Sequence, residues 1–473
     1  MVAKFAFALA TSGVLGLHRD EFYYLASGRH LSWGYVDNPP LVPWIYAGVN
    51  GLLGHSALAL GMVPALCGAA YILVAVLLVA EVGGGRSAQL LVAAAAALGP
   101  VYLTTAHFLS TVDIELLAAG TATWLIIRLI RTGQDRLWLA VGAVVGVGLL
   151  DKYTLGLWLA AAIAGLLIAG PHRALLTPWA GAGAVVAAAL VAPSLAWQAQ
   201  HHWAILTFTS NLARDNGTSD RVQFLPLQLG IVTLAGTVAW VSGARHAWKG
   251  QARWLTIGFL LSAVVLLVAG GKAYYLADWY LPLLGVGAAH VEAAWAPRGR
   301  RWLLGAVVVT GLVSLPLFTP VLPASATVAL GLDKANNDLG AMLGWSHVAG
   351  QIATVDHALP PAERPGAIIL TQDYSEAGAV DLYATRLDIP NAISGHNSYW
   401  PWGYGYPRAD AAVIAVGIDA ALLNRDWSSV TRVSTLGRDS TPVDPQERGT
   451  PIYLCRTQRV PWATIWPTLR HYD

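Results

Sequence analysis

Long runs of apolar residues recur along the first two thirds of the chain and constrain its fold more than any other feature. They cover residues 5–17, 57–79, 89–106, 114–130, 137–150, 155–170, 179–197, 226–243, 255–270, 281–294 and 303–321. Charged residues make up only 12% of the chain, against about 25% in soluble domains. Because a membrane-spanning helix needs about 20 apolar residues, we predict a mainly α-helical, polytopic membrane protein. The runs predict about eleven transmembrane helices, the first retained rather than cleaved as a signal peptide.

The basic residues between these runs favour one orientation in the membrane. With the N-terminus inside, twelve Lys and Arg residues fall in cytoplasmic segments and six on the opposite side, as expected from the excess of positive charge in cytoplasmic loops. The outer side also holds a group of carboxylates: Asp20, Glu21, Asp37, Asp113, Asp151, Asp215, Asp220 and Asp278. We therefore expect a multi-pass protein of a bacterial plasma membrane whose chemistry lies outside the cytoplasm.

The apolar runs stop near residue 322, and residues 323–473 are predicted to form a separate extracytoplasmic domain. "GAIIL" and "NAISG" have the composition of buried strands, a helix begins near Ser375 between them, and "AAVIAVGI" supplies another strand. We predict a small α/β domain. Its aromatic segment "GHNSYWPWGYGYP", residues 395–407, either stacks on a sugar, lies at a membrane surface, or packs inside the domain.

Some motifs have simpler explanations than catalysis. The segment "GAVVGVG", residues 142–148, lies inside an apolar run, where small residues let helices approach closely. His201 and His202 could bind a metal ion, but an adjacent pair in a polar loop, here the predicted outer loop 198–225, is more often solvated. No glycine-rich segment has the spacing of a phosphate-binding loop.

Residues 18–41, "HRDEFYYLASGRHLSWGYVDNPPL", follow the first apolar run and carry the two adjacent carboxylates Asp20 and Glu21. Residues 20–31 can form an amphipathic helix along the outer membrane surface, with aromatic side chains at the interface, and a second short helix follows the Asn-Pro-Pro turn. On such a helix the two carboxylates point about 100° apart, so we expect one to be chemical and the other structural. The alternative is that both only favour the helix N-terminus.

This stretch resembles the first outer loop of a known family. "RDEFYYLASGRHLSWGYVDNPPLVPWI" is similar to that loop in the polyprenyl-phosphate-sugar-dependent glycosyltransferases of the GT-C fold, the group that contains protein O-mannosyltransferases and the lipid A aminoarabinose transferase. The resemblance continues through "LSTVDIE", "LLDKYTLG", "GGKAYYLADWYLPLL", "QDYSEAGAVDLY" and "GHNSYWPWG". It implies that residues 1–322 form a transmembrane glycosyltransferase domain, and that Asp20, with Glu21 beside it, faces the sugar and the acceptor.

Such a transfer needs a base for the acceptor proton and positive charge for the departing phosphate. Asp20 is the candidate base. Asp113 and Glu115, at the outer start of an apolar run, could orient the sugar, the acceptor or a divalent cation. The alternative for Asp113 is a helix cap with Ser110. No cofactor other than this possible divalent cation is expected.

Lysine is rare in the chain, yet Lys152 and Lys272 lie at the outer ends of apolar runs, where a phosphate would explain their charge. Snorkelling to the interface is the alternative. The neighbouring side chains of Tyr153, Tyr274 and Tyr275 could bind sugar hydroxyls or the lipid headgroup. Further phosphate candidates, Arg214 and Arg221, lie in the predicted outer loop 198–225.

We therefore expect a membrane glycosyltransferase that moves a sugar, mannose or a pentose, from a polyprenyl phosphate to an extracytoplasmic protein, glycan, lipid or metabolite. A multi-spanning transporter or flippase is the alternative, although its ionisable residues should lie near the membrane midplane in interrupted helices. A non-catalytic binding protein on the same scaffold is also open. The net charge of +2 gives no indication of a nucleic-acid partner.

Overall fold

The computed structural model describes all 473 residues, and its internal contacts divide the chain into two compact units. Unit 1 comprises residues 1–11, 38–42 and 60–319, and unit 2 comprises residues 12–37, 43–59 and 320–473. The first loop thus belongs with the C-terminal residues in one unit. The predicted division into residues 1–322 and 323–473 stays a proposal, because it assigns the first loop to the N-terminal domain.

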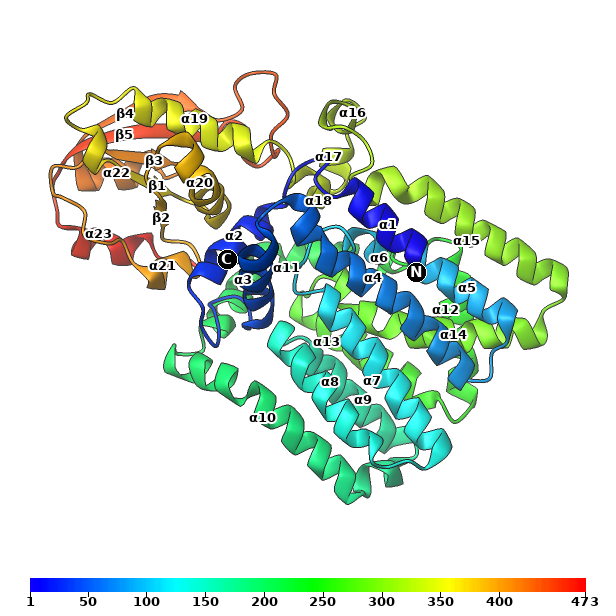
Figure 1. Cartoon of the computed structure of the whole chain (residues 1–473). Coiled ribbons are helices and arrows are strands. Elements are labelled where there is room, and N and C mark those ends of the chain that lie inside the picture. The colour runs from blue at the N-terminus through cyan, green and yellow to red at the C-terminus, as the bar shows by residue number, and fades with distance from the viewer. The chain divides into compact units, whose positions relative to one another are not determined.

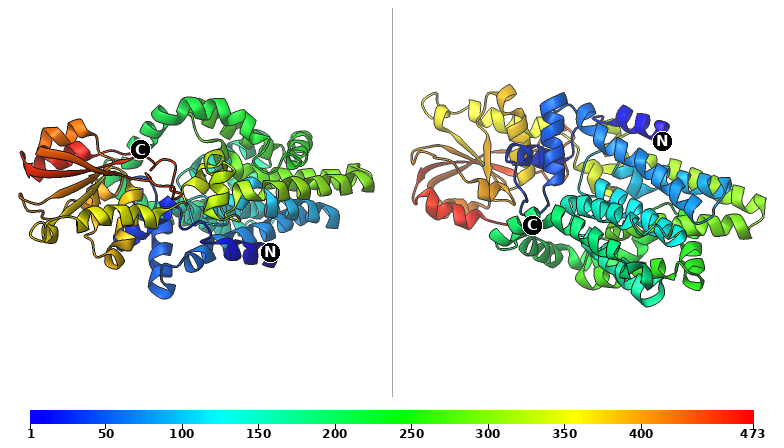
Figure 2. Two further views of the ribbon diagram at one scale, coloured as in Figure 1. Left: turned by 90° about the horizontal axis from the view of Figure 1, so that it is seen from above. Right: turned by 60° about the horizontal axis from the view of Figure 1, so that its bottom comes forward.

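Unit 1 is built from helices. They are α1 (Val2–Thr11), most of α4 (Ala57–Glu81), α5 (Arg86–Leu98), α6 (Pro100–Thr104), α7 (Asp113–Thr132), α8 (Leu137–Asp151), α9 (Leu155–Ala169), α10 (Pro178–Gln200), α11 (Ala204–Gln228), α12 (Gly236–Lys249), α13 (Arg253–Ala269), α14 (Ala277–Ala294) and α15 (Pro297–Phe318), with the short turns η1 (His172–Leu176) and η2 (Ala273–Leu276). The long helices of this unit run side by side (Figures 1 and 2).

Three helices are long and apolar enough to cross a membrane, namely α4, α10 and α15. The pair α12 and α13 passes the same test together but is bent by 118° at its break. The predicted count of eleven spans is therefore not confirmed. Several apolar runs form helices of only 10–17 residues, which is shorter than the roughly 20 residues that a bilayer requires. Three spans, or four if the bent pair forms one, still make the chain a multi-pass membrane protein.

Close helix packing explains the glycines of residues 142–148. A Cβ atom on Gly142 would lie 2.0 Å from the carbonyl oxygen of Gly183, and one on Gly146 would lie 2.6 Å from a methyl carbon of Leu190. Helices α8 and α10 therefore touch backbone to backbone, as small residues allow in membrane proteins. The packing interpretation of this motif is correct.

The predicted outer loop 198–225 is wrong, because residues 204–228 form the 25-residue helix α11. This segment lacks a continuous apolar run and was therefore expected to be a loop. However, residues 204–225 contain no proline and only one glycine, Gly217, so nothing in them breaks a helix. Most of its polar side chains are exposed or half-buried, and Gln228 at its end is buried.

Unit 2 contains a five-stranded sheet and short helices. Its strands are β1 (Ile368–Thr371), β2 (Ala392–Ser394), β3 (Val413–Val416), β4 (Trp427–Thr435) and β5 (Pro451–Gln458). Its helices are α2 (Arg19–Arg29), most of α3 (Leu41–Leu53), α16 (Ala324–Ala329), α17 (Leu332–Ala335), α18 (Asn337–Gly340), α19 (Trp345–His357), α20 (Tyr374–Leu387), α21 (Tyr399–Trp402), α22 (Ala420–Asp426) and α23 (Trp462–Leu469), with the turn η3 (Arg364–Gly366).

The sheet has the order β2-β1-β3-β5-β4, with β2, β1 and β3 parallel and the other two pairings antiparallel. Alternate residues face opposite sides, so Leu370, Val413 and Ala415 pack with α22 and α23. Helices α19 and α20 contact the sheet through β3, β1 and β2, and Figure 1 shows α19 and α23 on opposite sides of the strands. The α/β prediction is confirmed for this part of the chain, whereas the antiparallel pair β4–β5 was not predicted.

Helix α2 forms where an amphipathic helix was predicted, but its aromatic face does not lie at a membrane surface. Phe22, Tyr23 and Tyr24 are at most 7% exposed, because α2 packs against α20 within unit 2. Gly378 permits this contact, since a Cβ atom there would lie 2.8 Å from the Phe22 backbone. Of the side chains predicted to lie at the interface, only Leu31 and Trp33 are exposed.

Candidate active site

Asp20 lies in the first turn of α2, which His18 caps. The His18 Nδ1 atom accepts the Asp20 N–H at 3.2 Å, and this contact fixes the direction of the first turn. The Tyr374 hydroxyl donates to Asp20 Oδ1 at 2.8 Å. The Asp20 side chain is 30% exposed. Asp20 is therefore an oriented carboxylate that an acceptor hydroxyl can reach.

Glu21 has the opposite environment. Its carboxylate accepts the backbone N–H of His18 at 2.8 Å and the Tyr46 hydroxyl at 3.1 Å, which completes a capping box. Glu21 is only 3% exposed. Burial raises the pKa of Glu21 to about 7, although the hydrogen bonds from His18 and Tyr46 oppose the rise. The geometry thus gives Asp20 an accessible carboxylate and gives Glu21 a structural role.

Tyr374 is a residue of this site that sequence reasoning missed. It begins α20, after the cap residue Asp373, and its ring lies 4.7 Å from the ring of Tyr23. Tyr23 in turn donates to Asp37 at 2.5 Å and accepts the Ser398 N–H at 3.2 Å. The segment "QDYSEAGAVDLY" contains Tyr374 and was part of the family resemblance. That motif could therefore have identified the residue.

Asp113 begins α7 in unit 1 and bonds the turn that precedes the helix. Its Oδ2 atom accepts the Ser110 N–H at 2.9 Å and the Ser110 hydroxyl at 3.1 Å. Asp113 is 4% exposed. The two residues predicted to form a helix cap are thus bonded to each other, but the cap position of α7 is Val112, which has no side-chain cap hydrogen bond. A catalytic or metal-binding role for Asp113 stays a proposal.

Glu115 and Lys152 form a buried ion pair that the sequence did not anticipate. The Lys152 amine lies 3.3 Å from Glu115 Oε2, with the two side chains 13% and 5% exposed. Thr154 donates its hydroxyl to the other Glu115 oxygen, and the Glu115 N–H donates to Asp151 at 2.9 Å. Lys152 is therefore already neutralised, which favours a positioning role over direct contact with a phosphate.

Two further buried carboxylates adjoin this pair. Asp151 is fully buried and Asp278 is 5% exposed, and one oxygen of each makes no hydrogen bond. Both interact electrostatically with Glu115 and Lys152. We call Glu115, Asp151, Lys152, Lys272 and Asp278 the lysine–carboxylate cluster. Because a buried carboxylate oxygen without a hydrogen bond is costly, the two unbonded oxygens are typical of a site that binds a ligand rather than of a packed core.

Lys272 is the cation of this cluster that lacks a carboxylate partner. It is partly exposed and forms no ion pair, and its amine lies 6.0 Å from the centre of the Tyr274 ring. The Lys152 amine lies 5.3 Å from the same ring and 4.5 Å from the Tyr275 ring. The two predicted lysines and two of the predicted tyrosines are thus brought together in unit 1.

The remaining predicted residues lie elsewhere on unit 1. The Tyr153 hydroxyl bonds the Ser194 hydroxyl at 2.6 Å. Arg214 and Arg221 are exposed on α11, and Arg221 donates to the Val268 carbonyl at 3.0 Å. Arg214 bonds only Asn211, at 3.4 Å, on the same helix. Neither arginine lies in a loop, and a role in phosphate binding stays a proposal for both.

The aromatic segment 395–407 is largely packed within unit 2. Tyr399 is 4% exposed, and the Trp402 ring stacks on His30 at 4.3 Å. Tyr404 stacks on Trp462 at 5.8 Å. Only Tyr406 is fully exposed, so sugar stacking is available to this residue but not to the whole segment.

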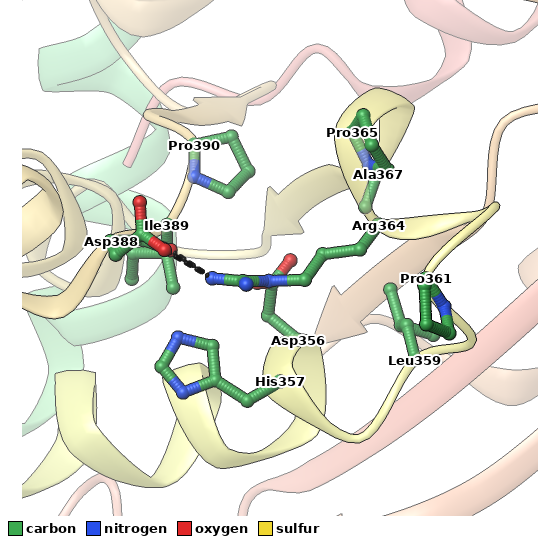
Figure 3. Close-up of a pocket in the computed structure, with 10 residues that line it drawn as sticks. All are labelled: Asp356, His357, Leu359, Pro361, Arg364, Pro365, Ala367, Asp388, Ile389 and Pro390. Carbon is green, nitrogen blue, oxygen red and sulfur yellow. Dashed lines mark hydrogen bonds and ion pairs between the residues drawn. The ribbon is translucent and has the colours of Figure 1, made fainter.

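A separate surface pocket of unit 2, with a volume of about 540 Å³, contains no predicted residue. Figure 3 shows the Arg364 guanidinium between two carboxylates in this pocket. It lies 3.0 Å from Asp356 and 2.7 Å from Asp388. Because its only cation is already paired, the pocket has no free charge for a phosphate.

The chain has the features of the GT-C class of membrane proteins. These are apolar helices, a first loop that forms helices, buried charges at helix ends and a C-terminal α/β part. Residues 37–197 match the family model of the dolichyl-phosphate-mannose-protein mannosyltransferases. The solved structure of ArnT from Cupriavidus metallidurans in the apo state covers 96% of this chain and 97% of its own, with 16% identity and a TM-score of 0.60.

The same ArnT bound to undecaprenyl phosphate matches with equal coverage, 15% identity and a TM-score of 0.58. No curated protein matches the chain. The resemblance to the GT-C glycosyltransferases is thereby confirmed, and the chain has their fold.

Proposed function

We propose that this chain is a membrane glycosyltransferase that takes a sugar from a polyprenyl phosphate. The observation that carries the proposal is its whole-length fold similarity to ArnT, of which one structure holds undecaprenyl phosphate. The family-model match over residues 37–197 supports the same donor class, since that family is described by a dolichyl-phosphate sugar. Mannose or a pentose would be transferred to an acceptor outside the cytoplasm of a bacterial cell.

In this proposal Asp20 is the general base. The acceptor hydroxyl loses its proton to the Asp20 carboxylate and attacks the anomeric carbon, while the bond from that carbon to the phosphate oxygen breaks with inversion. The products are the glycosylated acceptor, the polyprenyl phosphate and protonated Asp20. The Tyr374 hydroxyl on Oδ1 supports this role, because it fixes the carboxylate. The acceptor would bond Oδ2, which lies 3.7 Å from His18 Nδ1.

We assign binding of the donor phosphate to Lys272. Its amine has no carboxylate partner in unit 1, whereas the Lys152 amine lies against Glu115. A free ammonium can form charge-assisted bonds to phosphate oxygens. Lys152 then acts as a positioning residue through Glu115 and the rings of Tyr274 and Tyr275.

A divalent cation at Asp113 or Glu115 is less well supported. Ser110 occupies one Asp113 oxygen, and Lys152 and Thr154 occupy both oxygens of Glu115. Protein groups therefore satisfy both oxygens of Glu115 and one oxygen of Asp113. The proposed transfer therefore relies on no cation at this position.

The alternative is a transporter or flippase of a lipid-linked substrate. The bend of 118° between α12 and α13 favours it, because interrupted helices often line transport sites. The buried charges, however, lie at helix ends: Glu115 near the start of α7, Asp151 at the end of α8 and Asp278 at the start of α14. This arrangement fits a reaction at one membrane face better.

The test is a donor-consumption assay with the purified full-length protein. Undecaprenyl-phosphate mannose and undecaprenyl-phosphate arabinose are each supplied with a bacterial envelope extract as the acceptor source, and released undecaprenyl phosphate is measured. Release with either donor, lost in Asp20→Asn, supports the enzyme. Movement of intact donor across vesicles without release would instead support the transporter.

A further inference from the structure

Two parallel strands of unit 2 end side by side, and chemically reactive side chains follow both. Thr371, the last residue of β1, pairs with Ser394, the last residue of β2. Asp373 follows β1 and His396 follows β2. In open α/β sheets, ligands bind at the carboxyl ends of the strands. This edge of the sheet is therefore a natural place for a ligand.

The end of the chain adds a third segment here. The His471 N–H donates to the Gly395 carbonyl at 3.1 Å, and the Asn397 N–H donates to the His471 carbonyl at 3.0 Å. The resulting parallel bridge places the His471 ring on the His396 ring, with centroids 4.5 Å apart and planes at 19°. Two imidazoles that are 75 residues apart in the chain are thus held together by backbone hydrogen bonds.

Hydrogen bonds fix the orientation of both histidine rings. His471 Nδ1 lies 2.8 Å from the Leu469 carbonyl. Because a carbonyl only accepts, Nδ1 carries the proton and Nε2 has a lone pair, which the Gln372 side-chain amide faces at 3.2 Å. A cation would displace this amide. His396 Nδ1 lies 3.4 Å from the Asp373 carboxylate and faces the Tyr374 N–H at 3.2 Å. Its Nε2 lies 3.1 Å from Asp473 Oδ1 and 3.0 Å from the Asp473 carbonyl oxygen, so a cation bound at Nε2 would replace these contacts. Metal-bound histidines commonly have a carboxylate or a carbonyl behind the ring in this way.

We propose that His396, His471 and Asp473 form a binding site for a zinc-class divalent cation, with Asp373 as the outer partner of His396. One ligand atom from each of the three residues lies within 4.8 Å of the others. Ligands at the usual zinc distances of about 2.0–2.2 Å lie roughly 3.4 Å apart around a tetrahedron. Side-chain movements of about 1 Å therefore close the site.

The composition of the site fits zinc better than calcium or magnesium. Two imidazoles and one carboxylate are preferred by zinc, whereas calcium and magnesium prefer oxygen ligands alone. His396 is 4% exposed, while His471 and Asp473 are more accessible, so a cation can enter from the solvent side. The cation would neutralise two carboxylates that otherwise share one histidine.

The site adjoins Asp20 through one residue. The Tyr374 ring lies 4.8 Å from the His396 ring, and its backbone nitrogen lies 3.2 Å from His396 Nδ1, while its hydroxyl holds Asp20. A bound cation would therefore order the residue that orients the candidate base. The proposal itself concerns cation binding and does not depend on glycosyl transfer.

Zinc binding to the full-length protein, carrying a histidine-free N-terminal tag and treated with a chelator, tests the site. We expect one zinc per chain by mass spectrometry of bound metal and by titration. His471→Ala and Asp473→Ala should weaken zinc binding by 100-fold or more, and Asp373→Asn by about 10–100-fold. His55→Ala is the control, because His55 is exposed in the same unit, and its zinc affinity should be unchanged.

A measurement on the unmodified protein makes the test independent of variant folding. Zinc-edge X-ray absorption should report two imidazole nitrogens, and bound cobalt should show the visible spectrum of a four- or five-coordinate site. The proposal is overturned if the unmodified protein retains no zinc, if the absorption spectrum contains no imidazole, or if His471→Ala binds as tightly as His55→Ala. The last result would assign the cluster to an ion triad around His396.

Discussion

Asp20 and Glu21 are adjacent in the chain, yet their carboxylates have different partners and accessibility. Asp20 receives one hydroxyl and keeps contact with solvent, whereas Glu21 is enclosed by His18 and Tyr46. A base must be reachable by the hydroxyl that it deprotonates, within hydrogen-bond distance. Of the two residues only Asp20 meets this requirement.

The first prediction concerns Asp20 and its partner Tyr374. Asp20→Asn keeps the size of the side chain but removes the basic oxygen, so turnover at saturating donor should fall by about 10²- to 10⁴-fold. Tyr374→Phe removes only the hydrogen bond that stabilises the charged carboxylate. Because a hydrogen bond to a charged group is worth roughly 1.5–3 kcal/mol, turnover should fall by about tenfold or more, while the apparent donor constant stays unchanged.

The control is Tyr383→Phe on the same helix, whose hydroxyl makes no hydrogen bond with Asp20. Its turnover and donor constant should match those of the unmodified protein. Near-normal turnover in Asp20→Asn would assign the base to another carboxylate, with Asp113 the next candidate. Normal turnover in Tyr374→Phe would limit that residue to packing.

The second prediction separates the two lysines. Lys272→Ala should raise the apparent donor constant about tenfold or more, because a charge-assisted bond to phosphate is worth roughly 1.5–3 kcal/mol, and should leave the melting temperature nearly unchanged. Lys152→Ala leaves Glu115 buried without its partner, which typically costs about 3–5 kcal/mol of stability. Donor titrations and thermal unfolding of both variants measure the difference.

Restoring neutrality provides the matched control for Lys152. The double variant Glu115→Gln/Lys152→Met has no buried charge at this pair, so it should recover much of the stability lost in Lys152→Ala. Equal destabilisation in the single and double variants would argue against the ion pair. If the apparent donor constant rises equally in Lys152→Ala and Lys272→Ala, both amines bind the phosphate.

At the scale of elements, the capping box of α2 makes stability depend on pH. The pKa of Glu21 is raised by burial from its ordinary 4.5 to about 7, so the folded chain binds more protons than the unfolded chain between these values. The free energy of unfolding therefore falls as pH rises through this interval and is constant above it. The total loss is roughly 3 kcal/mol, at about 1.4 kcal/mol per pKa unit.

Glu21→Gln removes this titration while its amide can still accept the His18 N–H. Between about pH 5 and 7 the melting temperature of the unmodified protein should fall relative to that of this variant. Above pH 7 the difference between the two melting temperatures should stay constant. Thermal unfolding in detergent across this range is the measurement. A constant difference between the two melting temperatures over the whole pH range would show that Glu21 is ionised at all these pH values.

The crossing of α2 and α20 gives a further prediction at this scale. Gly378→Ala places a Cβ atom 2.8 Å from the Phe22 backbone, and such overpacking typically costs about 1–3 kcal/mol. Gly350→Ala in α19 is the matched control, because nothing lies within 4 Å of its Cβ position. That variant should be as stable as the unmodified protein or slightly more so. Equal unfolding temperatures for the two variants would contradict the close crossing.

At the scale of the whole molecule, the orientation in the membrane is open to a direct test. The excess of basic residues predicts that a reporter fused after residue 322 is active outside the cytoplasm and that one fused near residue 134 is active inside. Matched fusions to a periplasmic and a cytoplasmic reporter give the answer. Reversed signals would place Asp20 on the wrong side for the proposed donor and would remove the proposed function.

Local signals in the sequence predicted most helices and three strands but not their long-range partners. The apolar runs predict helices because the hydrophobicity and periodicity of a segment can be read from neighbouring residues alone. The failure at α11 arose because a polar helix lacks such a run. Tyr374, 354 residues from Asp20, and the Glu115–Lys152 pair depend on tertiary packing, which composition and spacing do not encode. The aromatic face of α2 was assigned to lipid for the same reason.

The contact between Asp20 and Tyr374 also has a consequence for the biosynthesis of the protein. The two residues are 354 positions apart, so a ribosome that adds about 5–20 residues per second finishes Tyr374 roughly 20–70 s after Asp20. During that interval the aromatic face of α2 has no α20 to cover it. A nascent chain that stops before residue 374 would therefore expose Phe22 and Tyr23 and be recognised by chaperones and proteases, so the organism would accumulate only chains in which the candidate base is already held.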